Sequence, residues 1–112
     1  MAWQQDYDNA LMAVLATMNH APTWRQAKAP NQQQTVRAHV RQFTGDEQEL
    51  INTYGVTGVA IYVDAASIPV VPEKFDSFTL ADTGEKYVAA GIHEMRGARN
   101  TVLFYTIFCK GQ

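Results

Sequence analysis

The feature that most constrains the fold is an alternation of apolar and polar side chains along residues 72–111. A repeat of two residues is the period of a pleated strand whose two faces meet different surroundings. The alternation occurs in three successive segments, and residues typical of turns separate them. The predicted strands are 77–80, 87–92 and 101–109. Three strands joined by two short turns predict an antiparallel meander.

Two further strands and a short helix are predicted ahead of this meander. Residues 35–43 and 58–64 both alternate with a period of two. Between them, Thr44 and Glu47 have the spacing of a helix capping box, and Gly55 suits a helix C-cap. The inserted segment 44–55 is therefore expected to be helical. Residues 23–27, with Trp24 as an anchor, are compatible with a short edge strand.

The N-terminal part of the chain has a helical period instead. Leu11, Val14, Leu15 and Met18 follow one another at the spacing of one helix face, which predicts a helix over about 7–20. The whole pattern predicts a mainly β fold in a single domain, 1–112, with a β core at about 35–111. We expect a small antiparallel β-barrel or sandwich of about five to six strands, with an N-terminal α-helix and a short inserted helix.

Composition narrows the function classes. Apolar residues make up 46% of the chain and charged residues 18%, as in a globular protein, and the net charge of -2 does not favour strong nucleic-acid binding. The single cysteine, Cys109, excludes an intrachain disulfide. No apolar run reaches the roughly 18 residues of a membrane span, and the first residues do not resemble a signal peptide, so we expect a cytosolic protein without membrane contact.

Sequence motifs for catalysis or metal binding are not found in the chain. The three histidines stand far apart and belong to no metal-ligand pattern, and Cys109 lies in an apolar strand without a flanking base. We therefore expect no enzymatic activity, no cofactor and no metal. The function has to be sought among contacts with other macromolecules.

Three groups of residues are candidates for such contacts. One strand face carries Arg37, His39 and Arg41, which could meet nucleic-acid phosphates or the carboxylates of a partner; an ordinary solvated sheet face is the alternative. The inserted helix supplies acidic residues. These are Asp46, Glu47 and Glu49. A basic segment and a separate acidic one suit head-to-tail contacts between identical copies.

The last strand supplies the third group. Phe104 and Phe108 lie on the face opposite Leu103, Tyr105 and Ile107. Two phenylalanines in register are not expected on an open sheet face. Either the N-terminal helix or another subunit should cover them, and the second possibility makes them candidate interface residues.

The order of these elements resembles that of the head-closure proteins of tailed bacteriophages, also called head–tail connector, stopper or neck proteins. The resemblance is carried by TVRAHVRQF at 35–43, GVAIYVDAASIP at 58–69, PEKFDSF at 72–78 and the hairpin at 79–93. It implies a non-catalytic subunit of a homo-oligomeric ring in the virion neck, made in the host cytoplasm. Such a ring docks under the portal, helps to retain packaged DNA that passes without sequence recognition, and attaches the tail proteins.

Two alternatives stay open. A tail-completion or tail-tube protein also forms rings from small β domains. A small β-barrel that binds single-stranded nucleic acid is an alternative of another class, in which Tyr62, Tyr87 and Tyr105 would stack on bases.

Overall fold

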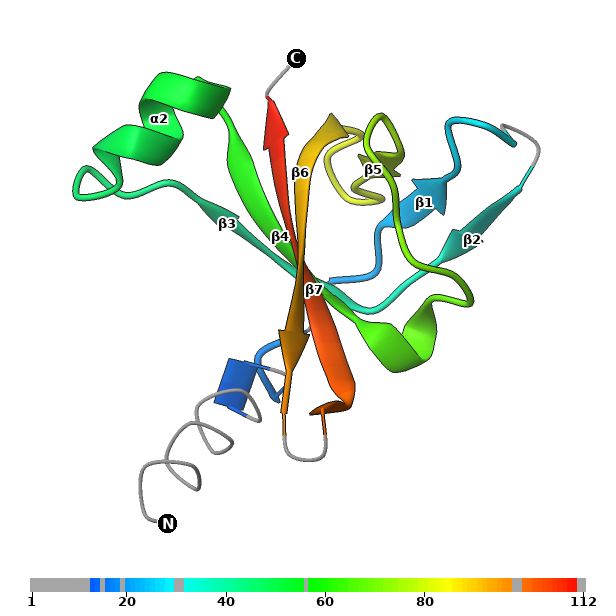
Figure 1. Cartoon of the computed structure of the whole chain (residues 1–112). Helices are drawn as coiled ribbons and strands as arrows, with labels where there is room; N and C mark the ends of the chain where they lie inside the picture. The colour runs from blue at the N-terminus through cyan, green and yellow to red at the C-terminus, as the bar shows by residue number, and fades with distance from the viewer. Residues whose placement is uncertain are drawn as a thin grey trace, which may run out of the picture.

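The computed structural model describes residues 13–14, 16–18, 20–29, 32–55, 57–97 and 100–110. Its strands form one seven-stranded antiparallel sheet, which curls into a half-barrel (Figure 1). The strands are β1 (Thr23–Arg25), β2 (Gln33–Thr35), β3 (Ala38–Gln42), β4 (Val59–Asp64), β5 (Ser77–Thr79), β6 (Lys86–Arg96) and β7 (Val102–Lys110). The helix α2 (Gln48–Tyr54) and the 3-10 turn η1 (Ala65–Ser67) flank β4 in the chain. The mainly β class and the inserted helix are thus confirmed.

The strand count corrects the predicted five to six. The order across the sheet is β2-β1-β5-β6-β7-β4-β3, so the meander of β5, β6 and β7 forms its centre, as the alternation predicted. The first extra strand is β1, which lies between β2 and β5 rather than at an edge. The β core therefore begins near Thr23 and not near residue 35. Trp24 is buried in this core because it faces Phe78 across the β1–β5 pair.

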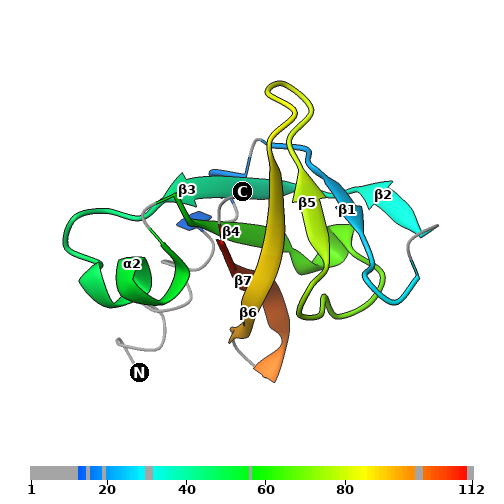
Figure 2. The ribbon, with the colours of Figure 1, turned by 90° about the horizontal axis from the view of Figure 1, so that it is seen from above.

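The second extra strand arises because the predicted strand 35–43 is bent. β2 and β3 stand at opposite ends of the strand order, yet only Val36 and Arg37 separate them in the chain (Figure 2). The amide of Val36 donates to the carbonyl of Pro22 (3.0 Å), and the amide of Asp64 donates to the carbonyl of Arg37 (2.9 Å). One extended segment thus serves both edges of the curled sheet.

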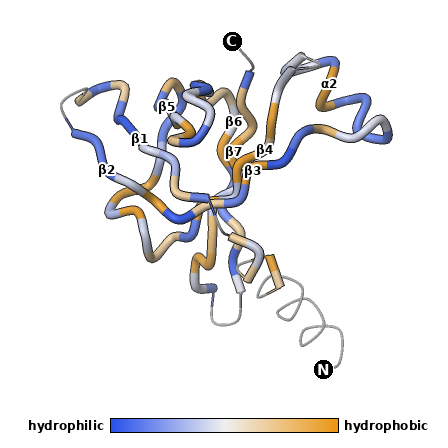
Figure 3. Tube along the Cα trace, turned by 180° about the vertical axis from the view of Figure 1, so that it is seen from behind, coloured by the Kyte–Doolittle hydropathy of each residue, from blue (hydrophilic) through white to orange (hydrophobic). Residues whose placement is uncertain are grey.

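The concave side of the half-barrel holds the main core. Alternate residues of β4 and β7 point into it, as their sequence period predicts, and Ile61 and Ile107 are fully buried. Hydrophobic stretches follow the central strands in Figure 3. In β6 a register shift between Ala89 and Gly91 inserts one residue, Ala90. This bulge lets Ala89 and Ile92 pack against the same core although they lie three positions apart.

The N-terminal helix predicted over 7–20 lies mostly outside the described residues. Among those described, Ala13, Val14 and Ala16 are helical. The helix ends earlier than predicted, because the amide and hydroxyl of Thr17 both donate to the Val14 carbonyl, and His20 already forms a β-bridge with Ala38. The imidazole of His20 also accepts the Val40 amide (3.3 Å), so His20 caps the outer edge of β3.

Candidate functional site

The convex face of the sheet carries Phe104 and Phe108, the two phenylalanines that were expected to be covered by the N-terminal helix or by another subunit. Phe104 is 2% exposed and packs with Met18, Val14 and Met95, while Tyr62 meets its ring edge-on at 5.8 Å between centroids. The segment before β1 therefore covers Phe104, which was one of the two predicted outcomes. Because it is buried within its own chain, Phe104 is not available for a contact between subunits.

The other phenylalanine, Phe108, is covered in part by α2. The ring of Tyr54 stacks on Phe108 with centroids 5.4 Å apart. This approach needs a glycine at position 91, where a Cβ atom would lie 2.7 Å from the Tyr54 hydroxyl. The helix ends as predicted at Gly55, whose φ of 93° is a conformation that glycine adopts freely and whose amide donates to the Ile51 carbonyl.

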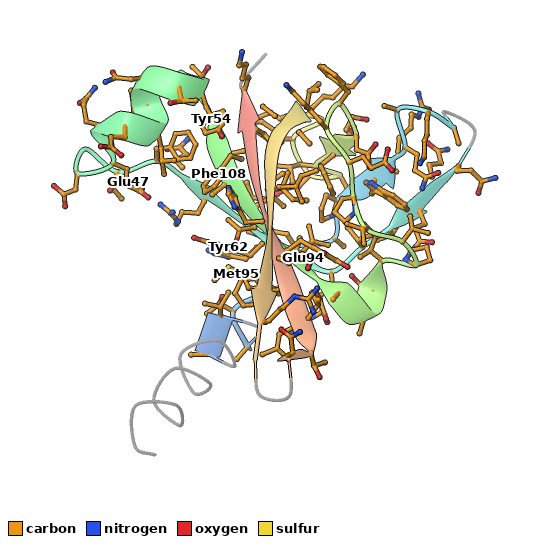
Figure 4. All side chains as sticks on the ribbon, in the orientation of Figure 1. Glu47, Tyr54, Tyr62, Glu94, Met95 and Phe108 are labelled. Carbon is orange, nitrogen blue, oxygen red and sulfur yellow. The ribbon has the colours of Figure 1, made fainter. Side chains whose placement is uncertain are left out.

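Between these two covers lies a hollow of about 510 Å³, which we call the outer groove. Its apolar lining includes Tyr62, Met95 and Phe108 of the sheet and Leu50 of α2. Figure 4 shows Tyr54, Phe108, Tyr62 and Met95 following one another along the same side of the β6–β7 ladder. Charged residues line the groove as well, among them Glu47 and Glu94.

A bidentate ion pair holds α2 against the sheet beside this groove. Arg41 donates from its two terminal nitrogens to the two carboxylate oxygens of Glu47 (2.5 and 3.0 Å) and from Nε to the Tyr62 hydroxyl (3.1 Å). The Glu47 carboxylate also accepts the Thr44 amide (2.9 Å). This contact lies before the helix, because α2 begins at Gln48 with Glu47 as its N-cap, later than the start at Thr44 that the predicted capping box implied. The hydrogen bond from Arg41 lowers the pKa of Glu47 to about 2, and the same bond raises the pKa of Arg41.

The predicted basic row on 35–43 is thus engaged by its own chain. Besides the Arg41 pair, Arg37 forms an ion pair with Asp64 (3.0 Å) and donates to the Met18 carbonyl (3.2 Å). His39 stacks on Tyr62, with ring centroids 6.2 Å apart, and burial lowers its pKa, with His20 and Arg41 adding to the shift. The row exists, but its charges are balanced locally rather than offered to DNA or a neighbour.

A second surface lies on the other side of the molecule, at residues 73–76, which we call the Phe75 turn. Phe75 is 65% exposed and has a positive φ of 77°. The ammonium of Lys74 lies 5.4 Å from the centre of its ring. Val70 and Val71 just before the turn are also exposed, so an apolar tract projects from the segment that leads into β5.

A buried carboxylate fixes this turn. Asp76 is 2% exposed and accepts three hydrogen bonds: from the indole of Trp24 (3.0 Å), the amide of Ala27 (2.9 Å) and the amide of Glu73 (2.9 Å). It thereby ties the turn to β1 and to the loop that follows β1. Sequence analysis singled out residues 72–78 but not this role, because a lone aspartate before a strand carries no signal of its distant donors.

The charges divide between the two surfaces. The ion pairs are Lys28–Glu73, Arg37–Asp64, Arg41–Glu47 and Arg96–Glu94. The basic side chains of the described residues that join no ion pair are Arg25, Lys74, Lys86 and Lys110. We call these four the basic patch. Arg25 and Lys86 line a hollow of about 170 Å³ together with Phe75. Lys110 ends a cross-strand row that runs from Arg25 through Ser77 and Val88.

The acidic candidates lie at α2. Asp46 and Glu49 are exposed and join no ion pair among the described residues, whereas Glu47 between them is held by Arg41. In Figures 1 and 2, α2 and the β1–β2 hairpin stand on opposite sides of the β6–β7 ladder. The α2 side therefore presents the exposed acids Asp46 and Glu49, and Arg25 and Lys86 lie beside the Phe75 turn on the other side. The exposed acids Asp82 and Glu85 lie just before Lys86 in the chain, so the second side is not purely basic.

The remaining chemical candidates are enclosed. Burial raises the pKa of the Cys109 thiol to about 12, so the thiolate that would be needed for nucleophilic chemistry is suppressed. Tyr87 and Tyr105, proposed to stack on bases, are each 7% exposed and face the core. Within the described part of the chain, no three potential ligands among His, Cys, Asp and Glu come together to hold a metal ion.

The arrangement is suited to binding at two distinct surfaces. No helix among the described residues has the length and apolarity needed to cross a membrane. Comparisons of the chain with protein-family models, with curated proteins and with solved structures found no match.

Proposed function

We propose that the chain is a structural virion protein of a tailed bacteriophage, a head-closure or head–tail connector subunit that assembles as a homo-oligomeric ring in the neck. In this role it docks beneath the portal, helps to retain the packaged DNA and attaches the tail, without catalysis. The proposal rests on the resemblance of most of the chain from Thr35 onward to such proteins and on the small curled β-sheet with an inserted helix.

The observation that carries the proposal is the pair of unlike surfaces on opposite sides of one small domain. A ring requires heterologous contacts, in which one patch of a subunit meets a different patch of the next. The outer groove with its acidic helix and the Phe75 turn with the basic patch are two such patches. The interior of the half-barrel, in contrast, is filled by core side chains.

The test is a binding and packaging experiment with portal and tail-tube proteins from the same genome. We expect the tagged chain to be retained by assembled portal, and DNA-filled capsids that lack it to lose their DNA. Asp82→Asn, in the exposed turn before β6, serves as a matched control that leaves both readouts unchanged. A tight dimer that ignores portal would refute the proposal, and retention by tail tube instead of portal would identify a tail-completion role.

A further inference from the structure

The Phe75 turn holds an aromatic side chain outward in a strained conformation. A positive φ is unfavourable for any residue with a Cβ atom, and Phe75 adopts 77°. The surrounding structure enforces it, since the Phe75 amide donates to the Ala89 carbonyl (2.8 Å) and the Asp76 carboxylate accepts the Glu73 amide. Backbone strain that the surroundings enforce is characteristic of contact and switch residues. With its ring 65% exposed, Phe75 contributes little to its own core.

The outer groove has the size and lining to receive such a ring. An apolar cavity of about 150 Å³ is enough to hold a benzene molecule. The outer groove is open to solvent, measures about 510 Å³ and offers Tyr62, Met95 and Phe108 as apolar and aromatic contacts. A phenyl ring and the aliphatic part of a neighbouring side chain can therefore enter the groove without a change in its width.

The charges around the two features are complementary. The Lys74 ammonium lies 5.4 Å from the centre of the Phe75 ring, and Arg25 and Lys86 line the hollow beside it. None of the three joins an ion pair with another described residue. The α2 region, whose Glu47 and Leu50 line the groove, also carries Asp46 and Glu49, which are exposed and join no ion pair among the described residues. Opposite charges at the rim of an apolar contact orient the partners and exclude other arrangements.

The chain cannot satisfy this complementarity alone. The segment that leads into β5 and the helix α2 lie on opposite sides of the β6–β7 ladder in both Figure 1 and Figure 2. We propose that the outer groove of one copy receives Phe75 of a second copy, with Lys74 and the rest of the basic patch facing Asp46 and Glu49. This contact is heterologous, so it propagates from copy to copy. It names the interface of the ring and in that respect rests on the proposed function.

Disulfide trapping tests the contact in the full-length chain. Lys74→Cys, which keeps the Phe75 ring, is mixed with Leu50→Cys, which places a thiol in the groove wall, and the mixture is exposed to a mild oxidant. Asn52→Cys is the matched control, because it lies on α2 but does not line the groove. The native Cys109 does not compete, since it is fully buried and its pKa is raised. We expect the Lys74→Cys and Leu50→Cys pair to form the linked dimer at least tenfold faster than the control pair.

A complementation experiment tests the direction of the contact. Phe75→Gly removes the ring, and Leu50→Lys places a cation where Lys74 should approach. Each variant alone should sediment as a monomer at concentrations where the natural sequence associates, and an equimolar mixture should yield a dimer of one copy of each. Circular dichroism verifies that both variants are folded.

Several outcomes would overturn the proposal. These are equal trapping rates for groove and control cysteines, Lys74→Cys linking to itself as fast as to Leu50→Cys, and a natural sequence that stays monomeric at every concentration. Protection of Lys74→Cys from alkylation by a single-stranded oligonucleotide, lost at high salt, would assign the turn to nucleic acid instead. Neither portal nor DNA enters the trapping experiment, so its failure is distinguishable from failure of the proposed function.

Discussion

The buried carboxylate of Asp76 allows the sharpest test of how the fold supports its surfaces. It accepts hydrogen bonds from one indole and two backbone amides, and these donors lie in two segments that are distant in the chain, 24–27 and the Phe75 turn. Asp76→Ala removes the acceptor and leaves all three donors without a partner. The expected result is a large loss of stability, since an unsatisfied buried donor costs more than a hydrogen bond gains.

The magnitude follows from the accessibility of the donors. The indole of Trp24 is buried and cannot recruit water, so its loss is expected to cost about 2 kcal/mol. The amides of Ala27 and Glu73 are only partly buried and can turn to water, at about 1 kcal/mol each. The sum is about 4 kcal/mol, a large share of the roughly 5–15 kcal/mol by which domains are stable. Asp76→Asn keeps one oxygen but turns an NH₂ group toward a donor, and should cost about 2 kcal/mol.

The assay is urea unfolding followed by far-ultraviolet circular dichroism, because the change in midpoint at constant slope gives the change in free energy of unfolding. Asp82→Ala, an exposed acid in a turn, is the control and should change the free energy of unfolding by less than about 0.5 kcal/mol. If Asp76→Ala lost less than about 1 kcal/mol, the carboxylate would not be the clamp described above.

The remaining predictions concern the groove and the turn. The pKa of Glu47 is lowered to about 2 from 4.5, so its contribution to stability is present above pH 4.5 and is lost as the pH falls toward 2. The urea midpoint should therefore decrease over this pH range, and Glu47→Gln should remove this part of the pH dependence. Phe75→Gly should be about 1 kcal/mol more stable than Phe75→Ala in thermal unfolding, because both lose the ring and only glycine relieves the positive φ; equal stabilities would contradict that conformation. Gly91→Ala should cost about 1–2 kcal/mol by displacing the Tyr54 hydroxyl, and the cost should shrink in a Tyr54→Phe background.

Local sequence patterns predicted the elements whose neighbours in space are also close in the chain. The meander follows from strand periodicity, and α2 follows from its acidic start and Gly55, since these signals depend on a few adjacent residues. The bend between β2 and β3 did not follow, because both halves remain extended and only their pairing partners differ. The bulge at Ala90 could not be predicted either, because it changes which face of the sheet the later residues occupy without changing the residue types in the strand.

The candidate site was predicted less well than the fold. The acidic and basic groups were recognised, but the pairing of Arg41 with Glu47 depends on how α2 folds back on β3, and it removes Arg41 from the accessible charges. Tertiary contacts also leave Lys74 and Lys86, beside Phe75, without an ion pair among the described residues, and no local sequence pattern predicts this. The number and sign of the charged residues can be counted in the sequence. Tertiary contacts decide which of these side chains are paired within the chain and which stay available to a partner.

The bend at Val36 and Arg37 connects the two edge strands of the sheet directly. Because β2 and β3 are consecutive, an outward displacement of either strand pulls on the other, and neither edge can fray independently. A single proteolytic cut between these residues would let both edge strands detach. Detachment would leave the next strands, β1 and β4, with unpaired backbone groups, which promote edge-to-edge aggregation.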